Sequence, residues 1–369
     1  MTRSMRRIVC AGGTVSMLSL ALLLGGCGGG EEDAAGRAAP SNAAPEAQAA
    51  AADRSAQAKA VDLRSAPGPS QRRKARSRDW KGVTALVAAR GGDVIGAADD
   101  KGRVRVLDSA DSKVRTSVAG HHGASVTGVV FSPDGRSLIS VGRDSVAEVW
   151  NVADGKRMLT LRGHEHPVRS VAASAGGDLI ATGGEETRVM LWNARTGRLQ
   201  KVLYGASDFV NSVAFSPDGR LLAAGDAAAR VYLWDTATGA LRATLLGHAG
   251  EVNAVAFSPD GKLLASASDD MRVLTWNVAT AQQSGALTGH RAAVRSLAFG
   301  PDGHTLASGD EDGVIEIWDT AQERSTKRLA AGTSPINALA FHPKNADRLF
   351  AGSDNGQVTA WSVARGATN

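Results

Sequence analysis

The sequence predicts an all-β fold in which seven short antiparallel sheets form a closed ring. Tryptophans recur 42 or 43 residues apart, at Trp150, Trp192, Trp234, Trp276, Trp318 and Trp361. Leu107 lies 43 residues before Trp150 and marks a seventh unit. The clearest of these units also contains four strand patterns separated by turn signals. Repeats of this length with four strands each are typical of a β-propeller, whose sheets are called blades.

The clearest unit begins at Gly247 and shows how one blade is built. Residues 252–257 alternate as a strand, and Ser-Pro-Asp-Gly at 258–261 supplies a tight turn. Residues 263–268 and 271–276 are predicted to form the second and third strands. The segment 283–287 follows as the fourth and outermost strand. The unit therefore predicts four antiparallel strands per blade.

Three short motifs recur in register from about residue 80 to residue 369. They are Gly-His pairs ending at His121, His164, His248 and His290, Phe-Ser-Pro-Asp-Gly turns at Phe131, Phe215 and Phe257, and Trp-Asp pairs at Trp234 and Trp318. In these motifs the chain resembles the WD40-repeat family. The resemblance implies a seven-bladed WD40-type β-propeller.

The resemblance also implies a buried hydrogen-bonded tetrad in each blade, made by a histidine, a turn aspartate, a strand hydroxyl and the tryptophan. The matching positions are His121, Asp144 and Trp150; His248, Asp270 and Trp276; and His290, Asp312 and Trp318. Such polar sets fix local geometry when they are complete. The residues that depart from the pattern are Ala206, Thr333, Glu186, Ala228, Asn355, Lys101 and Leu107. We expect blades with these departures to be looser.

The last repeat stops too early to complete its own blade. Only residues 362–369 follow Trp361, which is too little for a fourth strand. Because propellers must close their ring, we expect an N-terminal segment at about 60–78 to donate that strand. Residues 60–65 are preferred over the basic run 72–77, because Val61 and Leu63 alternate with polar residues. The propeller domain is thus expected to span 60–369.

The N-terminus has the organisation of a secretion signal. Three arginines precede an apolar run at 8–24, and Leu24-Gly25-Gly26-Cys27 resembles the lipobox of bacterial lipoproteins. This resemblance implies a signal peptide at 1–26, lipidation of Cys27 and a place in the bacterial cell envelope. In a host with two membranes it implies the outer membrane, facing the periplasm. The alternative is an ordinary cleaved signal with a free Cys27.

Residues 27–59 are rich in Ala, Gly, Pro, Gln and Glu and are expected to form a flexible, disordered tether. Arg72, Arg73, Lys74, Arg76 and Arg78 form a basic run beyond it. This run either contacts anionic lipid headgroups or is simply solvated.

Charge and cysteine content exclude two further features. Residues 81–369 hold 30 basic and 30 acidic side chains, so the formal charge of +5 belongs to the N-terminal part. A nucleic-acid-binding surface is therefore not indicated. Removing Cys10 with the signal would leave Cys27 as the single cysteine, so no internal disulfide is expected.

The family resemblance assigns one residue of each innermost strand to the mouth of the central channel. These residues are Thr84, Thr127, Arg169, Asn211, Asn253, Arg295 and Asn337. Arg169 and Arg295 are suited to bind a carboxylate. A mostly acidic rim is expected above them, at Asp100, Arg143, Glu185, Asp269, Glu311 and Asp354. Ordinary turn chemistry is the alternative explanation of the rim.

Catalytic motifs are not evident. His164-Glu165-His166 has the look of a metal site, but His164 occupies the repeat position, so a structural role is favoured. Ser353-Asp354-Asn355 lacks the partner motif that a β-lactamase needs. We therefore predict a membrane-anchored scaffold that binds protein or peptide partners, with no metal, no cofactor and no enzymatic activity. The alternatives are an envelope hydrolase or lyase, and an envelope assembly factor.

Overall fold

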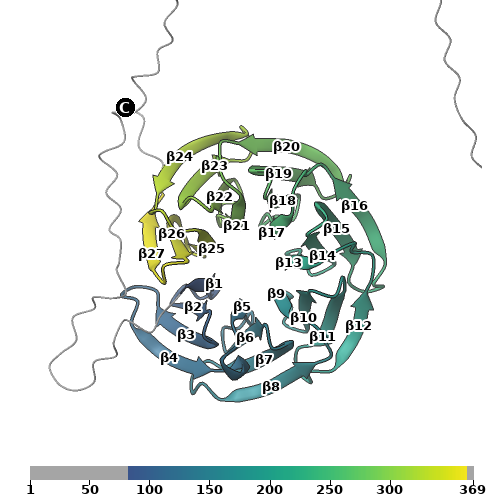
Figure 1. Cartoon of the computed structure of the whole chain (residues 1–369), viewed down its shortest axis with the longest axis vertical. Helices are drawn as coiled ribbons and strands as arrows, with labels where there is room; N and C mark the ends of the chain where they lie inside the picture. Colours follow the sequence, from purple (N-terminus) through teal and green to yellow (C-terminus); the bar gives the residue numbers. More distant parts are fainter. Residues whose placement is uncertain (1–81, 364–369) are drawn as a thin grey trace, which may run out of the picture. The chain divides into compact units, whose positions relative to one another are not determined.

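The structure is a computed structural model that describes residues 82–363, and these residues form seven antiparallel sheets around a central opening (Figure 1). Six sheets have four strands and the last, within the described residues, has three. The predicted all-β, seven-bladed propeller is therefore confirmed. In this part of the chain no helix is long or apolar enough to cross a membrane.

The strands follow the repeat. Blades 1 and 2 contain β1 (Val83–Ala88), β2 (Val94–Asp99), β3 (Arg103–Asp108), β4 (Val114–Ala119), β5 (Val126–Phe131), β6 (Ser137–Gly142), β7 (Val146–Asn151) and β8 (Arg157–Arg162). Blades 3 and 4 contain β9 (Val168–Ala173), β10 (Leu179–Gly184), β11 (Val189–Asn193), β12 (Leu199–Leu203), β13 (Val210–Phe215), β14 (Leu221–Asp226), β15 (Arg230–Asp235) and β16 (Leu241–Leu246).

Blades 5 and 6 contain β17 (Val252–Phe257), β18 (Leu263–Ser268), β19 (Arg272–Asn277), β20 (Gln282–Thr288), β21 (Val294–Phe299), β22 (Thr305–Asp310), β23 (Val314–Asp319) and β24 (Arg324–Ala330). Blade 7 contains β25 (Ile336–His342), β26 (Asn345–Ser353) and β27 (Val358–Ser362). A short 3-10 turn, η1 (His121–Gly123), precedes blade 2. In the unit analysed from sequence, β17 and β18 have the predicted bounds, and β19 begins one residue later than predicted.

Burial explains why the strands of one blade differ in composition. The second strand is buried almost throughout, as in β14, because blades pack against it from both faces. The outermost strand, such as β16, is mostly exposed. Between the first and second strands, the Ser-Pro-Asp-Gly turn is held by Ser258 Oγ, which donates to Asp260 Oδ1 over 2.6 Å. Gly261 follows at φ +72, a conformation that favours glycine.

Blade 7 packs directly on blade 1 and closes the ring. Val83, Leu86 and Phe350 share one buried cluster. Asn337 Nδ2 donates to the carbonyl oxygen of Val83 at 3.0 Å across this junction. A side chain at Gly352 would place its Cβ 2.5 Å from Val83 Cγ1, so only glycine permits this approach. The expected donor strand at 60–78, the signal peptide 1–26 and the tether 27–59 lie outside the described residues.

Candidate partner-binding face

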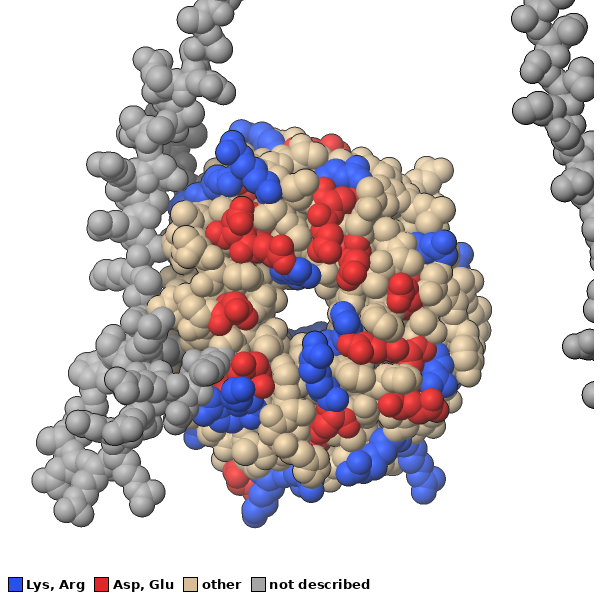
Figure 2. Space-filling model, in the orientation of Figure 1, with Lys and Arg blue, Asp and Glu red and all other residues tan. Residues whose placement is uncertain are grey.

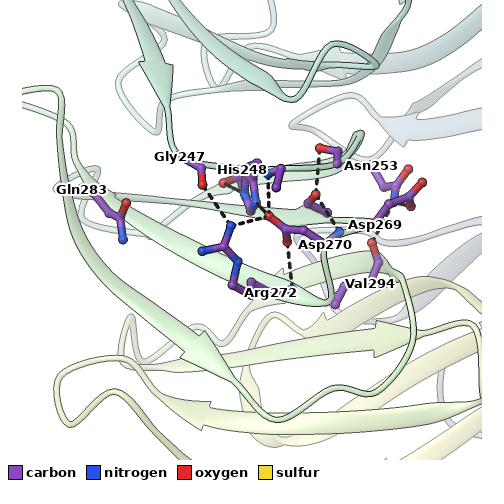
Figure 3. Close-up of polar contacts among 12 residues, drawn as sticks. Gly247, His248, Asn253, Asp269, Asp270, Arg272, Gln283 and Val294 are labelled. Atoms are coloured by element: carbon purple, nitrogen blue, oxygen red, sulfur yellow. Dashed lines mark hydrogen bonds and ion pairs between the residues drawn. The ribbon is translucent and has the colours of Figure 1, made fainter.

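A buried chain of hydrogen bonds fixes the upper face, which we define as the face carrying the turns between second and third strands. In blade 5, Trp276 Nε1 donates to Ser266 Oγ at 2.8 Å, and His248 Nε2 lies 2.8 Å from the same hydroxyl. His248 Nδ1 lies 2.8 Å from Asp270 Oδ2, a carboxylate that Arg272 also contacts (Figure 3). Because a carboxylate only accepts, Nδ1 carries the proton and Nε2 accepts from serine. Blade 2 has the same geometry at His121, Ser140, Asp144 and Trp150.

Blade 3 builds an equivalent set from different residues. Glu186 contacts His164 Nδ1 through a short hydrogen bond, and Thr182 Oγ1 lies 2.6 Å from Nε2. Trp192 Nε1 donates to the same threonine at 2.8 Å. Glu186 therefore completes the tetrad in this blade, although it departs from the aspartate of the pattern. The longer side chain of glutamate supplies the carboxylate at the place of aspartate.

The blade 6 tetrad corrects one assignment. His290 Nδ1 lies 2.7 Å from Asp310 Oδ2. Ser308 Oγ accepts a hydrogen bond from Trp318 Nε1 and also contacts His290 Nε2. Asp312 is exposed and does not take the predicted position. Asp310 ends strand β22 and is 1% exposed, so its carboxylate is already buried beside the histidine. The equivalent positions of blades 2 and 5 hold Gly142 and Ser268, so those blades take the carboxylate from the turn.

Blade 4 lacks the histidine and uses a tyrosine instead. Tyr232 stacks on Trp234 with ring centroids 5.4 Å apart. Its hydroxyl lies 2.8 Å from Asp226 Oδ2 and 3.0 Å from Ser207 Oγ. Burial raises the pKa of Tyr232, so the phenol stays protonated and donates to the carboxylate. This blade is thus held by its own polar set despite Ala206.

Burial also keeps two histidines neutral. It lowers the pKa of His164 and of His248, because removing an imidazolium from water costs more than Glu186 or Asp270 returns. Burial alone would raise the pKa of Glu186, but hydrogen bonds from the Glu165 amide and His164 lower it overall. Neutral imidazole beside an ionised carboxylate is therefore the resting state.

All seven residues of the predicted inner ring line one cavity of about 340 Å³ at the mouth of the central opening. They are Thr84, Thr127, Arg169, Asn211, Asn253, Arg295 and Asn337. Figure 2 shows Lys and Arg side chains at the edge of this opening and Asp and Glu side chains around it. Every blade therefore contributes a polar side chain to the same space.

The two arginines of the ring already hold carboxylates of this chain. Arg169 Nε donates to Glu185 Oε1 at 3.0 Å, and its guanidinium lies 5.2 Å from the Phe209 ring centroid. Arg295 Nε donates to Glu311 Oε1 at 2.9 Å. Each also reaches an asparagine of the neighbouring blade, Arg169 to Asn211 and Arg295 to Asn253. These bonds fix both side chains in place.

Four of the five smaller ring residues join adjacent blades. Each donates to the carbonyl oxygen of the first residue in the next inner strand: Thr127 to Val168, Asn211 to Val252, Asn253 to Val294 and Asn337 to Val83. Thr84 Oγ1 is buried without a partner among the described residues. The ring is thus a rigid, largely hydrogen-bonded surface.

Three further residues line the cavity and were not predicted: Ser125, Pro167 and Glu251. Each stands two positions before a ring residue, namely Thr127, Arg169 or Asn253. Strand side chains two apart share a face, so this period was a usable signal. Within residues 82–363 no cluster of three His, Cys, Asp or Glu side chains is arranged to hold a metal ion.

Comparisons with known proteins identify the class. Residues 112–151 and 155–193 match the WD domain, G-beta repeat, and residues 209–369 match the IFT122 first beta-propeller. The chain therefore carries WD40 repeats and a β-propeller domain.

Individual relatives match only short segments. The 26S proteasome regulatory subunit RPN14 of Saccharomyces cerevisiae is 33% identical over 72 residues, which is 20% of this chain and 17% of that protein. The small ribosomal subunit protein RACK1 of Glycine max is 45% identical over 49 residues, 13% of this chain and 15% of that protein. The apoptotic protease-activating factor 1 of Mus musculus is 31% identical over 77 residues, 21% of this chain and 6% of that protein. The matched segments thus span less than a fifth of each relative.

Proposed function

We propose that this propeller is a scaffold that binds a protein or peptide partner through the cavity at its upper face. The observation that carries the proposal is the convergence of one polar side chain from every blade on that cavity. Because most of these side chains are already held by hydrogen bonds, a partner would meet a pre-organised surface with little ordering cost. Relatives named as regulatory and ribosomal subunits are consistent with a role in assemblies.

The lining favours binding over the alternative of an envelope hydrolase or lyase. Hydroxyl, amide, guanidinium and carboxylate groups line the cavity, and neither histidine nor cysteine is among its described lining residues. Nucleophilic catalysis needs an activated nucleophile beside a base, whereas hydroxyls, amides and guanidinium groups suit recognition of a peptide.

The test compares two tryptophan substitutions in the full chain. Ser125→Trp fills the cavity, and Ser284→Trp places the same side chain on the exposed outer strand β20. Each protein is crosslinked in detergent extracts of the native host, and captured proteins are identified by mass spectrometry. The proposal expects a partner retained by wild type and Ser284→Trp but lost from Ser125→Trp, at unchanged melting temperature. Capture that is equal in all three, or absent from all three, would contradict it.

We further propose that Cys27 is lipidated and anchors the scaffold to a membrane of the bacterial cell envelope, the outer membrane facing the periplasm where the host has two. The sequence around Leu24-Gly25-Gly26-Cys27 supports this proposal. Radiolabelled palmitate should enter wild type and the matched control Cys10→Ser, and be lost from Cys27→Ser. Equal labelling of Cys27→Ser would refute the anchor.

A further inference from the structure

Arg143 is the one basic residue at a repeat position of the upper face that is acidic in most blades. The first residue of the turn between second and third strands is acidic in five blades, at Asp100, Glu185, Asp269, Glu311 and Asp354. In four of them it binds the ring residue of its own blade: Arg169 to Glu185, Asn253 to Asp269, Arg295 to Glu311 and Asn337 to Asp354. In blade 2 the turn residue is Arg143 and the ring residue is Thr127, and among the described residues these two side chains do not bond to each other.

Arg143 consequently presents an unpaired cation to the cavity. The residue is exposed and lines the cavity, and its guanidinium has no partner in the described part of the chain. Thr127 Oγ1 instead donates to the Val168 carbonyl at 2.5 Å. The five N–H donors of this guanidinium are therefore free for a ligand.

The backbone beneath Arg143 is fixed. Its amide donates to the Ser125 carbonyl at 3.0 Å. The next residue, Asp144, accepts from His121 Nδ1 at 2.8 Å inside the buried tetrad. A ligand bound by Arg143 would order only that side chain, because the turn is already held.

An unpaired anion faces the same cavity from another blade. Glu251 is exposed, lines the cavity, and its carboxylate has no partner among residues 82–363. Its carbonyl oxygen accepts from the Asp269 amide at 3.0 Å, which fixes the segment before β17. Figure 1 places β6 and β7, which flank Arg143, across the central opening from β17. The two segments that carry Arg143 and Glu251 thus lie on opposite sides of the central opening.

We infer that the cavity binds an extended protein segment carrying an Asp or Glu side chain, held by Arg143, and a Lys or Arg side chain, held by Glu251. This inference rests on the proposed scaffold function and names its ligand. A guanidinium binds a carboxylate through two parallel hydrogen bonds. The neighbouring carboxylates of Glu185 and Glu311 disfavour a polyanion, so a segment with one acid and one base suits the site better than an anionic lipid headgroup or nucleic acid.

The experiment is selection of random peptides displayed on phage against the full chain. Selections on wild type, Arg143→Glu and Glu251→Lys are run in parallel with a control, Arg220→Glu. Arg220 is exposed and lies in the turn between the first and second strands of blade 4, away from the upper face. Wild type and the control should enrich peptides with one acidic and one basic position. Peptides selected on Arg143→Glu should carry a base in place of the acidic position. Peptides selected on Glu251→Lys should carry an acid in place of the basic position. Synthetic wild-type peptides should bind Arg143→Glu at least tenfold more weakly, and charge-swapped peptides should recover binding.

The outcomes separate this inference from the function on which it rests. Peptides that bind wild type and Arg143→Glu equally, but are lost from Ser125→Trp, would overturn the charge assignment and support the scaffold. Peptides that do not depend on the cavity at all would overturn both. A switch of peptide charge that follows Arg143→Glu and Glu251→Lys, and not Arg220→Glu, would support the inference.

Discussion

The carboxylate of Asp310 lies 2.7 Å from Nδ1 of His290, and this pair is buried at the upper end of blade 6. Asp310 also accepts from the Val314 amide at 2.8 Å, so one side chain holds both the histidine and the turn. Asp310→Asn should destabilise the protein by about 1–3 kcal/mol, because a charged acceptor of two bonds is lost. Urea denaturation measures the effect. Asp312→Asn is the matched control, and an equal loss there would contradict the assignment.

Acidification should destabilise the propeller through His164 and His248. Their folded-state pKa values are lowered from the ordinary 6.5 by burial, so unfolded chains take up protons that folded chains refuse. The contribution is fully present above pH 6.5 and is lost as pH falls below it towards the folded-state values. Melting temperature measured from pH 7.5 to 5 should therefore decline. The decline should be smaller in His164→Gln, which removes one of the two titrating groups. An unchanged pH dependence in that variant would be evidence against this account.

Tyr232 should carry much of the stability of blade 4. Its hydroxyl contacts Asp226, which is 0% exposed, so Tyr232→Phe removes a partner from a buried carboxylate. A loss of about 1–3 kcal/mol is expected in chemical denaturation. The second tyrosine, Tyr204, is 67% exposed, and Tyr204→Phe is the control with no expected change. Equal stability of the two variants would show that the tyrosine does not replace the histidine.

Ring closure should be sensitive to one methyl group at Gly352. Gly352→Ala places Cβ 2.5 Å from Val83 Cγ1, where blade 7 meets blade 1. Overpacking of a buried contact costs about 1–3 kcal/mol, which thermal denaturation would detect. Gly91→Ala is the control, because its Cβ meets only the flexible Asp93 side chain. A Gly352→Ala protein as stable as wild type would mean that the junction yields easily.

The architecture could be predicted because the repeat is regular. Trp276 and Trp318 are 42 residues apart, and any side chain carried by the repeat recurs at that interval. Counting along the chain therefore places Asn253 and Arg295 at equivalent points of neighbouring blades, and both line the cavity. Strand bounds followed from the alternation of apolar residues, which needs no knowledge of distant contacts.

The hydrogen-bond partners of the polar side chains could not be predicted in the same way. Asp310 and Asp312 are both close in sequence to the turn of blade 6, and the burial of β22 decided which one meets His290. Arg169 and Arg295 were predicted to be suited to bind a carboxylate, and the folded chain places its own carboxylates, Glu185 and Glu311, against them.

The sequence by itself determined the number of blades and the order of strands, because these follow from a local, periodic pattern, and the resemblance to WD40 repeats added which residues face the channel. Only the tertiary structure decided which polar groups bond to each other, since those distances depend on how strands twist and blades pack. It also decided which charges remain free. Among residues 82–363 the side chains of Arg143 and Glu251 have no partner, while the ring residues Thr127 and Asn253 of their own blades bond to other groups.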